Sequence, residues 1–504
     1  MMDKIQETLT VEENSRTIET ENGGLGFATT GAALLDMNFK VSSYRNLSDN
    51  EIIADFAKAY NENKELALKW LFFARDVREG LGERRLFRVI SKWLATRDIS
   101  MAINIKHIPE FGRWDDIIEI LQSPLNTAIV DVNCRNLIRQ QIKKDLLDRD
   151  HGLPISLLGK WMPSINASSE ATRRKARQMA DILQMTPRVY RKTLSKLRAH
   201  LDVVEVKMTA NKWDAINYEA VPSIANVNYR TAFMRHDNER RTAFLSALEK
   251  GEVKINASTN FPHDIVSAYS ANKSRYSTQA DKVLDITLEE MWKRLPNYGL
   301  ENTLVVADGS GSMTSGMAGN AQPIDVANAL AVYCSERNSG EFKNKYITFS
   351  ECPQFVDLSK ASSLLDKINI ANMHNEVANT NINRVFKLIL KTAMANKMTQ
   401  EDMVANVLII SDMEFDEGTT TNATVFEEIK NDFADAGYKL PRLIFWNTCS
   451  RTNVVPIQEN ENGVALVSGF SVHILKMVMS GKLDAWEVLK NVLLSERYEK
   501  IIAS

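Results

Sequence analysis

The pattern of apolar residues changes at Glu301, and this change constrains the fold more than any other feature of the chain. Before it, apolar residues recur at helical spacing and strand-like alternation is scarce. After it, short apolar runs such as Leu304–Ala307 alternate with amphipathic segments such as Ile324–Glu336. The sequence therefore predicts a multidomain α plus α/β chain, in which a helical region precedes a mostly parallel, doubly wound sheet.

The region before the change is expected to be a stack of short helices. Ser48 and Glu51 have the spacing of a capping box, and Ile52, Phe56 and Tyr60 follow on one helical face. Helices of similar length, separated by turns with Gly or Pro, continue to about Lys293, without a clear repeat period. We expect a flexible tail over residues 1–25 and an α-helical repeat domain over residues 26–298.

The region after the change is expected to form one α/β domain over residues 299–504. The helices expected after Glu336 are Arg384–Met398 and Val425–Ala436. The strands expected after Leu304–Ala307 are Lys345–Phe349, Val407–Ser411, Arg442–Trp446 and Gly463–Val467. Ligands in such sheets bind beyond the carboxyl ends of the strands, so the functional groups are sought there.

Composition indicates a soluble globular protein. Apolar residues make up 44% and charged residues 25%, and 62 Lys and Arg nearly balance 64 Asp and Glu. A nucleic-acid surface must therefore come from local segregation of charge. The four cysteines are far apart, and no signal peptide or membrane-length apolar run is seen, so we expect a cytoplasmic protein with no membrane partner.

Three segments at expected strand ends or in the loops beyond them carry oxygen ligands. They supply Asp308, Ser310 and Ser312, then Thr380, then Asp412. Mg²⁺ prefers oxygen ligands and keeps several waters, so hydroxyls can bind it directly while carboxylates hold its waters. The five residues together predict a site for Mg²⁺ or another divalent cation, although a lone Asp-x-Ser-x-Ser is often only a turn and helix cap.

Catalysis is not the expected function. No Gly-x-Ser-x-Gly elbow, Walker sequence or Gly-x-Gly-x-x-Gly after a strand occurs, and the seven histidines form no ligand set. Glu414 and Asp416 are better explained as solvated loop residues than as ligands of a second metal. A metal-dependent hydrolase of phosphodiesters therefore ranks below RNA binding and below metal-dependent binding of a protein partner.

Charge segregates within the helical half. Residues 171–212 contain eleven Lys and Arg against three acids. The candidate RNA-binding residues are Arg135, Arg139, Lys143, Arg173, Arg174, Lys175, Arg177, Arg188, Arg191, Lys192, Lys196 and Arg198. A solvated helix face is the better explanation of a single cluster, but a window this long shifts the balance towards phosphate binding. Trp161, Tyr190, Trp213 and Tyr218 either stack on bases or belong to the core.

Two resemblances to known families follow from these residues. The Asp-x-Ser-x-Ser, Thr and Asp order resembles the metal-ion-dependent adhesion site of von Willebrand factor A domains. The whole chain from about Gly31 resembles the TROVE architecture of the Ro autoantigen, and more narrowly an uncharacterised TROVE-like group. The motifs that carry this second resemblance are Trp70–Arg78, Gly80–Arg85, Gly112–Asp116, Lys160–Ser164, Arg191–Ser195, Asp308–Met313, Ser411–Asp416 and Gly469–Ser471.

The resemblances imply both an architecture and partners. The architecture is a HEAT-like helical region that forms a ring closed by a Rossmann-like A domain, although the helical region is shorter than in the Ro proteins. In the Ro group such a ring binds small structured RNAs and the single-stranded ends of misfolded RNAs, and in A domains the metal takes an acidic group from a protein partner. The leading hypothesis is a non-catalytic RNA-binding protein, and the alternative is a metal-dependent module that recruits an acidic protein partner.

Overall fold

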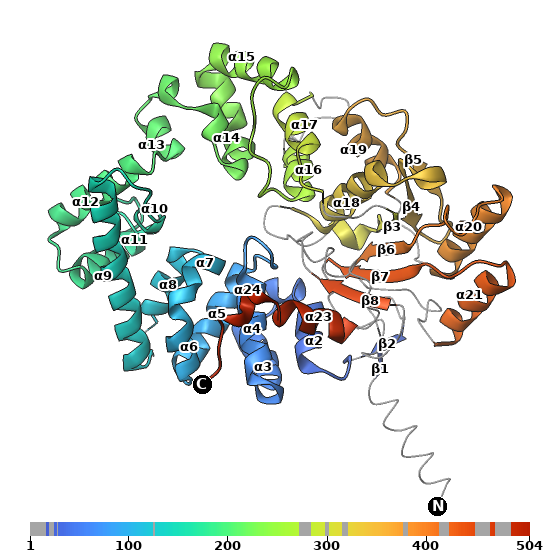
Figure 1. The fold of residues 1–504 in the computed structure, drawn as a ribbon, viewed down its shortest axis with the longest axis horizontal. Helices are drawn as coiled ribbons and strands as arrows, with labels where there is room; N and C mark the ends of the chain where they lie inside the picture. The colour runs from blue at the N-terminus through green and yellow to red at the C-terminus, as the bar shows by residue number, and fades with distance from the viewer. Residues whose placement is uncertain are drawn as a thin grey trace, which may run out of the picture.

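Helices form the first half of the chain and follow one another around an arc in the computed structural model (Figure 1). The structure describes residues 17–19, 25–27, 29–123, 126–271, 284–297, 302–314, 321–375, 382–412, 423–448, 464–468 and 485–504. The helices of the arc are α2 (Ala33–Phe39), α3 (Asp49–Glu62), α4 (Lys64–Arg75), α5 (Arg84–Ala95), α6 (Ile99–Asn104), α7 (Ile108–Phe111), α8 (Trp114–Leu121), α9 (Ala128–Asp150), α10 (Leu158–Trp161), α11 (Glu170–Ile182), α12 (Pro187–His200), α13 (Val204–Thr209), α14 (Ser223–His236), α15 (Asn238–Glu249), α16 (Pro262–Ala271) and α17 (Ile286–Lys293).

Local signals in the sequence explain where these helices start and which face they bury. The Ser48 hydroxyl accepts a hydrogen bond from the backbone N–H of Glu51, and the Glu51 carboxylate accepts one from the backbone N–H of Ser48, so the predicted capping box is present. Ile52 and Phe56 of α3 are fully buried. The last helix of the arc ends at Lys293, where the sequence predicts the helical region to end.

A six-stranded sheet forms the α/β part, in the order β5-β4-β3-β6-β7-β8. Its elements are β3 (Thr303–Asp308), α18 (Pro323–Arg337), β4 (Lys345–Phe349), β5 (Phe355–Asp357), α19 (Leu364–Met373), α20 (Ile382–Ala395), β6 (Asn406–Ser411), α21 (Ala423–Asp435), β7 (Arg442–Asn447) and β8 (Val464–Ser468). All neighbouring strands are parallel except β4 and β5. Helices α18 and α19 lie on one side of the sheet and α20 and α21 on the other (Figure 1). The predicted fold class is confirmed.

Some elements differ from the prediction. The edge strand β5, the helix α19 and the short antiparallel pair of β1 (Thr17–Glu19) with β2 (Leu25–Phe27) are absent from the sequence-based expectation. Residues 1–25, expected to be a flexible tail, thus include one paired strand, and residues 1–16 lie outside the described residues. Three-residue strands give too short an alternation to be recognised from sequence.

The helical arc meets the α/β domain first through α16 and α17. The Ser270 hydroxyl donates to the carboxylate of Asp325 in α18 at 2.9 Å. The buried carboxylate of Glu289 in α17 accepts from the backbone N–H groups of Leu364 and Leu365 at 2.8 and 3.1 Å. These are the first N–H groups of α19, so a side chain of the helical region caps a helix of the α/β domain.

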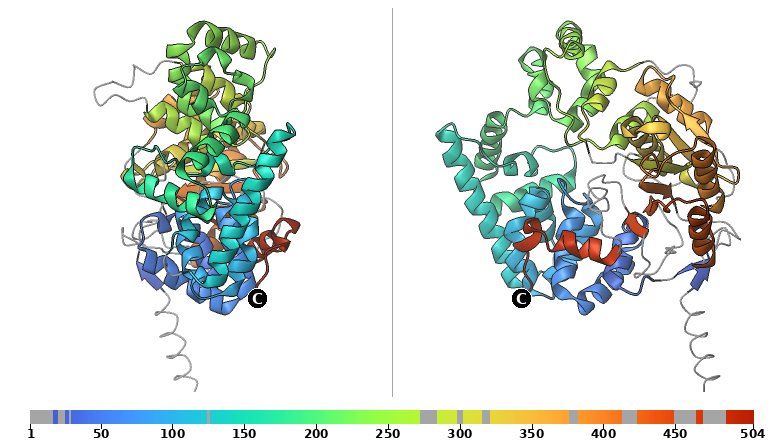
Figure 2. Two further views of the ribbon diagram at one scale, coloured as in Figure 1. Left: turned by 90° about the vertical axis from the view of Figure 1, so that its left-hand side faces the viewer. Right: turned by 45° about the vertical axis from the view of Figure 1, so that its right-hand side comes forward.

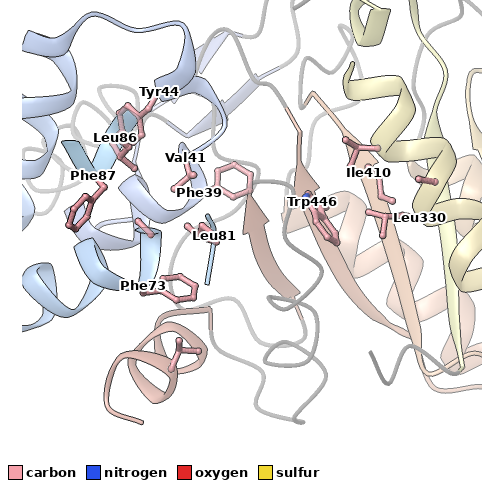
Figure 3. Close-up of a cluster of buried hydrophobic side chains, with 14 of the residues drawn as sticks. Phe39, Val41, Tyr44, Phe73, Leu81, Leu86, Phe87, Leu330, Ile410 and Trp446 are labelled. Atoms are coloured by element: carbon pink, nitrogen blue, oxygen red, sulfur yellow. The ribbon is translucent and has the colours of Figure 1, made fainter. Parts of the chain in front are cut away.

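The beginning of the arc meets the same domain at its other edge. The Asn447 amide at the end of β7 donates to the backbone carbonyl of Phe39 at 3.0 Å, and the Ser42 hydroxyl donates to Asn447 at 3.3 Å. Phe39 and Val41 lie between the N-terminal helices and the sheet that carries Trp446 (Figure 3). The helices therefore contact the α/β domain at both ends of the arc.

Two helices after the sheet complete this closure. Helices α23 (Ala485–Leu493) and α24 (Glu496–Glu499) lie across the N-terminal helices, as both views of Figure 2 and the contacts with α4 indicate. Tyr498 stacks on Phe111 with ring centroids 5.5 Å apart. The side-chain amide of Asn104 donates to the Ile502 carbonyl at 2.7 Å. We call residues 485–504 the clasp. The expected α/β domain, residues 299–504, thus ends in a segment that packs on the first helices, and the chain closes into a ring.

A buried ion-pair network holds the helices beneath the clasp together. The Arg75 guanidinium donates to Asp116 at 2.8 Å, and both side chains are almost fully buried. Arg88 of α5 donates to the other oxygen of Asp116 at 2.6 Å. A Cβ atom at Gly112 would lie 2.6 Å from the Asp116 carboxylate and 2.9 Å from Arg75, so only glycine fits there. The motif Gly112–Asp116 therefore has a structural role.

Candidate functional site

Four of the five proposed metal ligands lie at the carboxyl edge of the sheet. Strands β3 and β6 are parallel neighbours, with Ala307 opposite Ile410. Asp308 ends β3 and Asp412 directly follows β6, so both carboxylates emerge at the same edge. Asp308 and Asp412 are only 2% and 3% exposed. A carboxylate this deeply buried is stable only when it is hydrogen-bonded or bound to a cation.

The loop after β3 fixes the orientation of the Asp308 carboxylate. One of its oxygens accepts from the backbone N–H of Ser310 at 2.9 Å, and the other accepts from the Ser411 hydroxyl at 2.7 Å. The hydroxyl oxygens of Ser310 and Ser312 lie 2.8 Å apart. Ser411 is a site residue that the sequence analysis did not select, although its place beside Asp412 at a strand end was a signal for it.

This donor set fits a small hard cation. Two neighbouring ligands of an octahedral Mg²⁺ lie about 3.0 Å apart for metal–oxygen distances of about 2.1 Å. The hydroxyl oxygens of Ser310 and Ser312 share a hydrogen bond of 2.8 Å, which is close to this separation. Among the described residues no group of three or more His, Cys, Asp or Glu side chains could hold a metal. A cation at the edge of β3 and β6 would therefore need the hydroxyls of Ser310 and Ser312 as ligands. Thr380 lies outside the described residues.

Five of the twelve proposed RNA-binding residues are engaged within the protein. Arg139 donates to the Ile182 carbonyl at the end of α11 at 2.7 Å. Arg173 donates to the carbonyls of the loop before α11. Arg198 donates to the carbonyl of Gly159, the hydroxyl of Ser164 and the carbonyl of Met162, and its burial lowers its pKa. These three arginines are used to cap loops and helix ends, which their spacing in the sequence does not reveal.

The other two engaged residues form ion pairs. Arg135 pairs with Asp131 one turn earlier in α9, at 2.6 Å. Lys175 of α11 pairs with Glu119 of α8 at 2.5 Å. Partly exposed pairs of this kind are weak, so a phosphate that binds Arg135 or Lys175 must first compete with the carboxylate already there.

The seven remaining residues are exposed and form no ion pair within the described part of the chain. They are Lys143 of α9, Arg174 and Arg177 of α11, and Arg188, Arg191, Lys192 and Lys196 of α12. Helix α12 contains no acidic residue. Its opposite face buries Tyr190, Leu194 and Leu197, so packing of that face turns the cations toward solvent.

The aromatic candidates for base stacking are mostly used in packing. Tyr190 and Tyr218 are 0% and 4% exposed, and the Tyr190 hydroxyl donates to the Pro163 carbonyl at 2.8 Å. The Trp161 ring is covered by the guanidinium of Arg113, 3.9 Å from its centroid. The alternative of core aromatics is therefore correct for the two tyrosines.

The described helices include none that combines the length and the apolar character needed to cross a bilayer.

Family comparisons assign both halves of the chain. Residues 20–151 and 166–298 match a domain of unknown function, DUF2828, and residues 302–500 match another domain of unknown function, DUF7788. The chain thus combines a helical domain with an α/β domain of these two types, and it belongs to the DUF2828 family. A relative is an uncharacterised protein of Acanthamoeba polyphaga mimivirus, which is 30% identical over 497 residues and is matched over 92% of this chain and 84% of its own length.

The chain is also similar to a solved structure, the Ro (RSR) protein of Deinococcus radiodurans. The match has 15% sequence identity and a TM-score of 0.38, and it covers 94% of this chain and 95% of that protein. The motifs of the sequence indicate this same Ro group. A TM-score of this size carries no argument about function, so the site must be judged from its own residues.

Proposed function

We propose that this protein is a non-catalytic RNA-binding protein of the Ro and TROVE type, which binds small structured or single-stranded RNA on helices α9, α11 and α12. The observation that carries the proposal is the exposed face of α12, where Arg188, Arg191, Lys192 and Lys196 face solvent and the helix has no acid. Phosphates are the ligands that such a face attracts.

The charge of this surface is local. The chain as a whole carries a formal net charge of −2, so a general attraction to polyanions is not expected. Any RNA affinity should then depend on a few cations and fall steeply with salt, because each phosphate contact releases condensed counterions.

The test is a titration of labelled RNA against protein freed of nucleic acid, across a salt series. The variant Arg188→Glu/Arg191→Glu/Lys192→Glu should lower the affinity at least tenfold and flatten the salt dependence. The matched control is Lys387→Glu/Lys391→Glu, which reverses two exposed charges one turn apart on α20. Equal affinity of the wild type and the α12 variant would reject the proposal.

The second candidate function is a metal-dependent docking site in the α/β domain, taken as a von Willebrand A-type domain. The buried Asp308 and Asp412 and the paired hydroxyls of Ser310 and Ser312 support it. Bound Mg²⁺ would supply an open coordination position for a carboxylate from an acidic protein partner. Asp308→Asn and Asp412→Asn should then abolish capture of that partner while RNA affinity is unchanged.

A further inference from the structure

A basic groove runs along α5, apart from the residues assigned to RNA above. It encloses a cavity of about 510 Å³. The apolar part of its lining comes from Ile53, Val89 and Trp93. The groove is also lined by Arg84, Arg85, Arg88, Lys92 and Arg97. Asp49 is the only acid in the lining, so five cations oppose one carboxylate.

Two of these cations are unpaired. Arg85 pairs with Asp49, Arg88 with Asp115 and Asp116, and Lys92 with Glu119. Arg84 and Arg97, by contrast, are exposed and form no ion pair with any described residue. The groove therefore keeps an excess of positive charge after its internal pairs are counted, which is the condition for binding an anion.

The indole of Trp93 is fixed beside these cations. Its ring meets Phe56 and Tyr60 edge to face, with centroids 6.1 and 6.4 Å away. The guanidinium of Arg97 lies 5.2 Å from its centroid. The Trp93 side chain is only partly buried, so a rigid ring whose face carries the Arg97 guanidinium borders the groove.

We propose that the α5 groove binds one nucleotide unit, with a planar base against the Trp93 side and its phosphate group at Arg97, while Arg84, about 18 Å away at the other end of α5, adds to the positive charge of the groove. A cavity of about 510 Å³ lies within the usual range for small-ligand sites. A phosphate with an attached planar base uses both the cations and the apolar lining, whereas an acidic peptide uses the cations alone.

One carboxylate links the groove to helix α11 of the proposed RNA surface. Glu119 of α8 accepts from Lys92 of the groove at 3.3 Å and from Lys175 of α11 at 2.5 Å. A strand held by Arg174 and Arg177 of α11 thus has a neighbouring site for one of its nucleotides. The inference rests on the proposed function only if the nucleotide belongs to a bound RNA strand. A free nucleotide has the same base and phosphate and would need no RNA surface.

The probes are adenosine monophosphate and a ten-residue oligouridylate with or without a 5′ phosphate, titrated against the full chain. Whichever probe binds the wild type should bind Arg84→Glu/Arg97→Glu at least tenfold more weakly. The control variant Lys387→Glu/Lys391→Glu should bind it as tightly as the wild type does. Binding of the monophosphate indicates a free nucleotide, and binding of only the 5′-phosphorylated oligomer indicates an RNA end. In both cases a 4-thiouridine probe should cross-link to the peptide that contains Trp93.

Three outcomes would overturn the inference. The first is unchanged affinity of every probe in Arg84→Glu/Arg97→Glu, and the second is equal binding of inorganic phosphate, which would make the base irrelevant. The third is equal binding of an oligoglutamate peptide. If the α12 variant loses RNA and the α5 variant does not, the groove inference fails and the proposed function stands. If the α5 variant alone loses the probes, the groove stands and the α12 surface fails.

Discussion

Asp76 and Arg497 lie 421 residues apart in the sequence and form a bidentate ion pair in the fold. The second bond of the pair, from Arg497 Nη2 to Asp76 Oδ1, is 2.7 Å long, and the Tyr498 hydroxyl donates to the same carboxylate at 3.0 Å. Asp76 is fully buried. The hydrogen bonds with Asp76 and its charge raise the pKa of Arg497. The buried carboxylate is thus neutralised by the clasp.

Removing this partner should destabilise the ring. Arg497→Ala leaves the Asp76 charge buried with only neutral donors, and breaking a pair of this kind costs about 3–5 kcal/mol. The measurement is urea unfolding followed by far-ultraviolet circular dichroism. Lys500→Ala is the matched control, because its pair with Glu110 is exposed and should cost less than about 1 kcal/mol. Equal midpoints for the two variants would mean that the clasp does not contribute to stability.

Mg²⁺ should stabilise the protein through the edge of β3 and β6. A cation that binds only the folded state adds about 2.7 kcal/mol at a concentration one hundred times its Kd. Thermal unfolding with and without Mg²⁺ should show this gain in the wild type and lose it in Asp308→Asn. Asp366→Asn removes a half-buried capping carboxylate of α19, away from β3 and β6, and should keep the gain. A gain that persists in Asp308→Asn would place the cation elsewhere.

Substitution of Arg198 should lower the stability of the protein, whereas substitution of Arg191, on the same helix α12, should weaken RNA binding. Arg198→Ala loses three hydrogen bonds to Gly159, Met162 and Ser164 and should lower the free energy of unfolding by about 2 kcal/mol. Arg191→Ala should change stability by less than about 0.5 kcal/mol but reduce the salt slope of RNA binding by about 1. The reverse pattern would show that the exposed face of α12 is not the contact surface.

His263 should make the stability depend on pH. Burial lowers the pKa of its imidazole, Arg45 lowers it further, and Asp264 and Asp325 oppose the shift. Between the lowered folded-state pKa and the unfolded pKa of about 6.5, the unfolded chain binds this proton more strongly than the folded one, so the stability present above pH 6.5 is lost as the pH falls through this window. His263→Gln should therefore lose less stability between pH 7.5 and 5.5 than the wild type. His151→Gln, at an exposed position, is the control for the substitution itself.

The sequence predicts the layout of the fold because its signals are local. Strands such as Lys345–Phe349 coincide with the structure, since a run of apolar residues reports burial on both faces without knowledge of the neighbours. The pair of Ser310 and Ser312 hydroxyls is predicted for the same reason, because both lie in one short loop.

Contacts between distant segments are not predictable in this way. Nothing near Arg198 in the sequence indicates that it caps α10, and nothing near Asp76 indicates a partner in residues 485–504. The sequence therefore predicts too many RNA-binding cations. An arginine that donates to a distant carbonyl cannot be told from one that faces solvent by sequence alone. The α5 groove is likewise not predictable from the sequence, because its cations alternate with core residues of the same helix.

The clasp also sets the order in which the ring can form during synthesis. The helices that carry Asp76 and Phe111 leave the ribosome long before Arg497 and Tyr498 have been made. Until then the Asp76 carboxylate and the Phe111 ring have no partner from residues 485–504, and the surface between them stays open to other chains. Nascent protein stalled between residues 300 and 480 should therefore associate with chaperones or with itself, and completion of α24 should end that association.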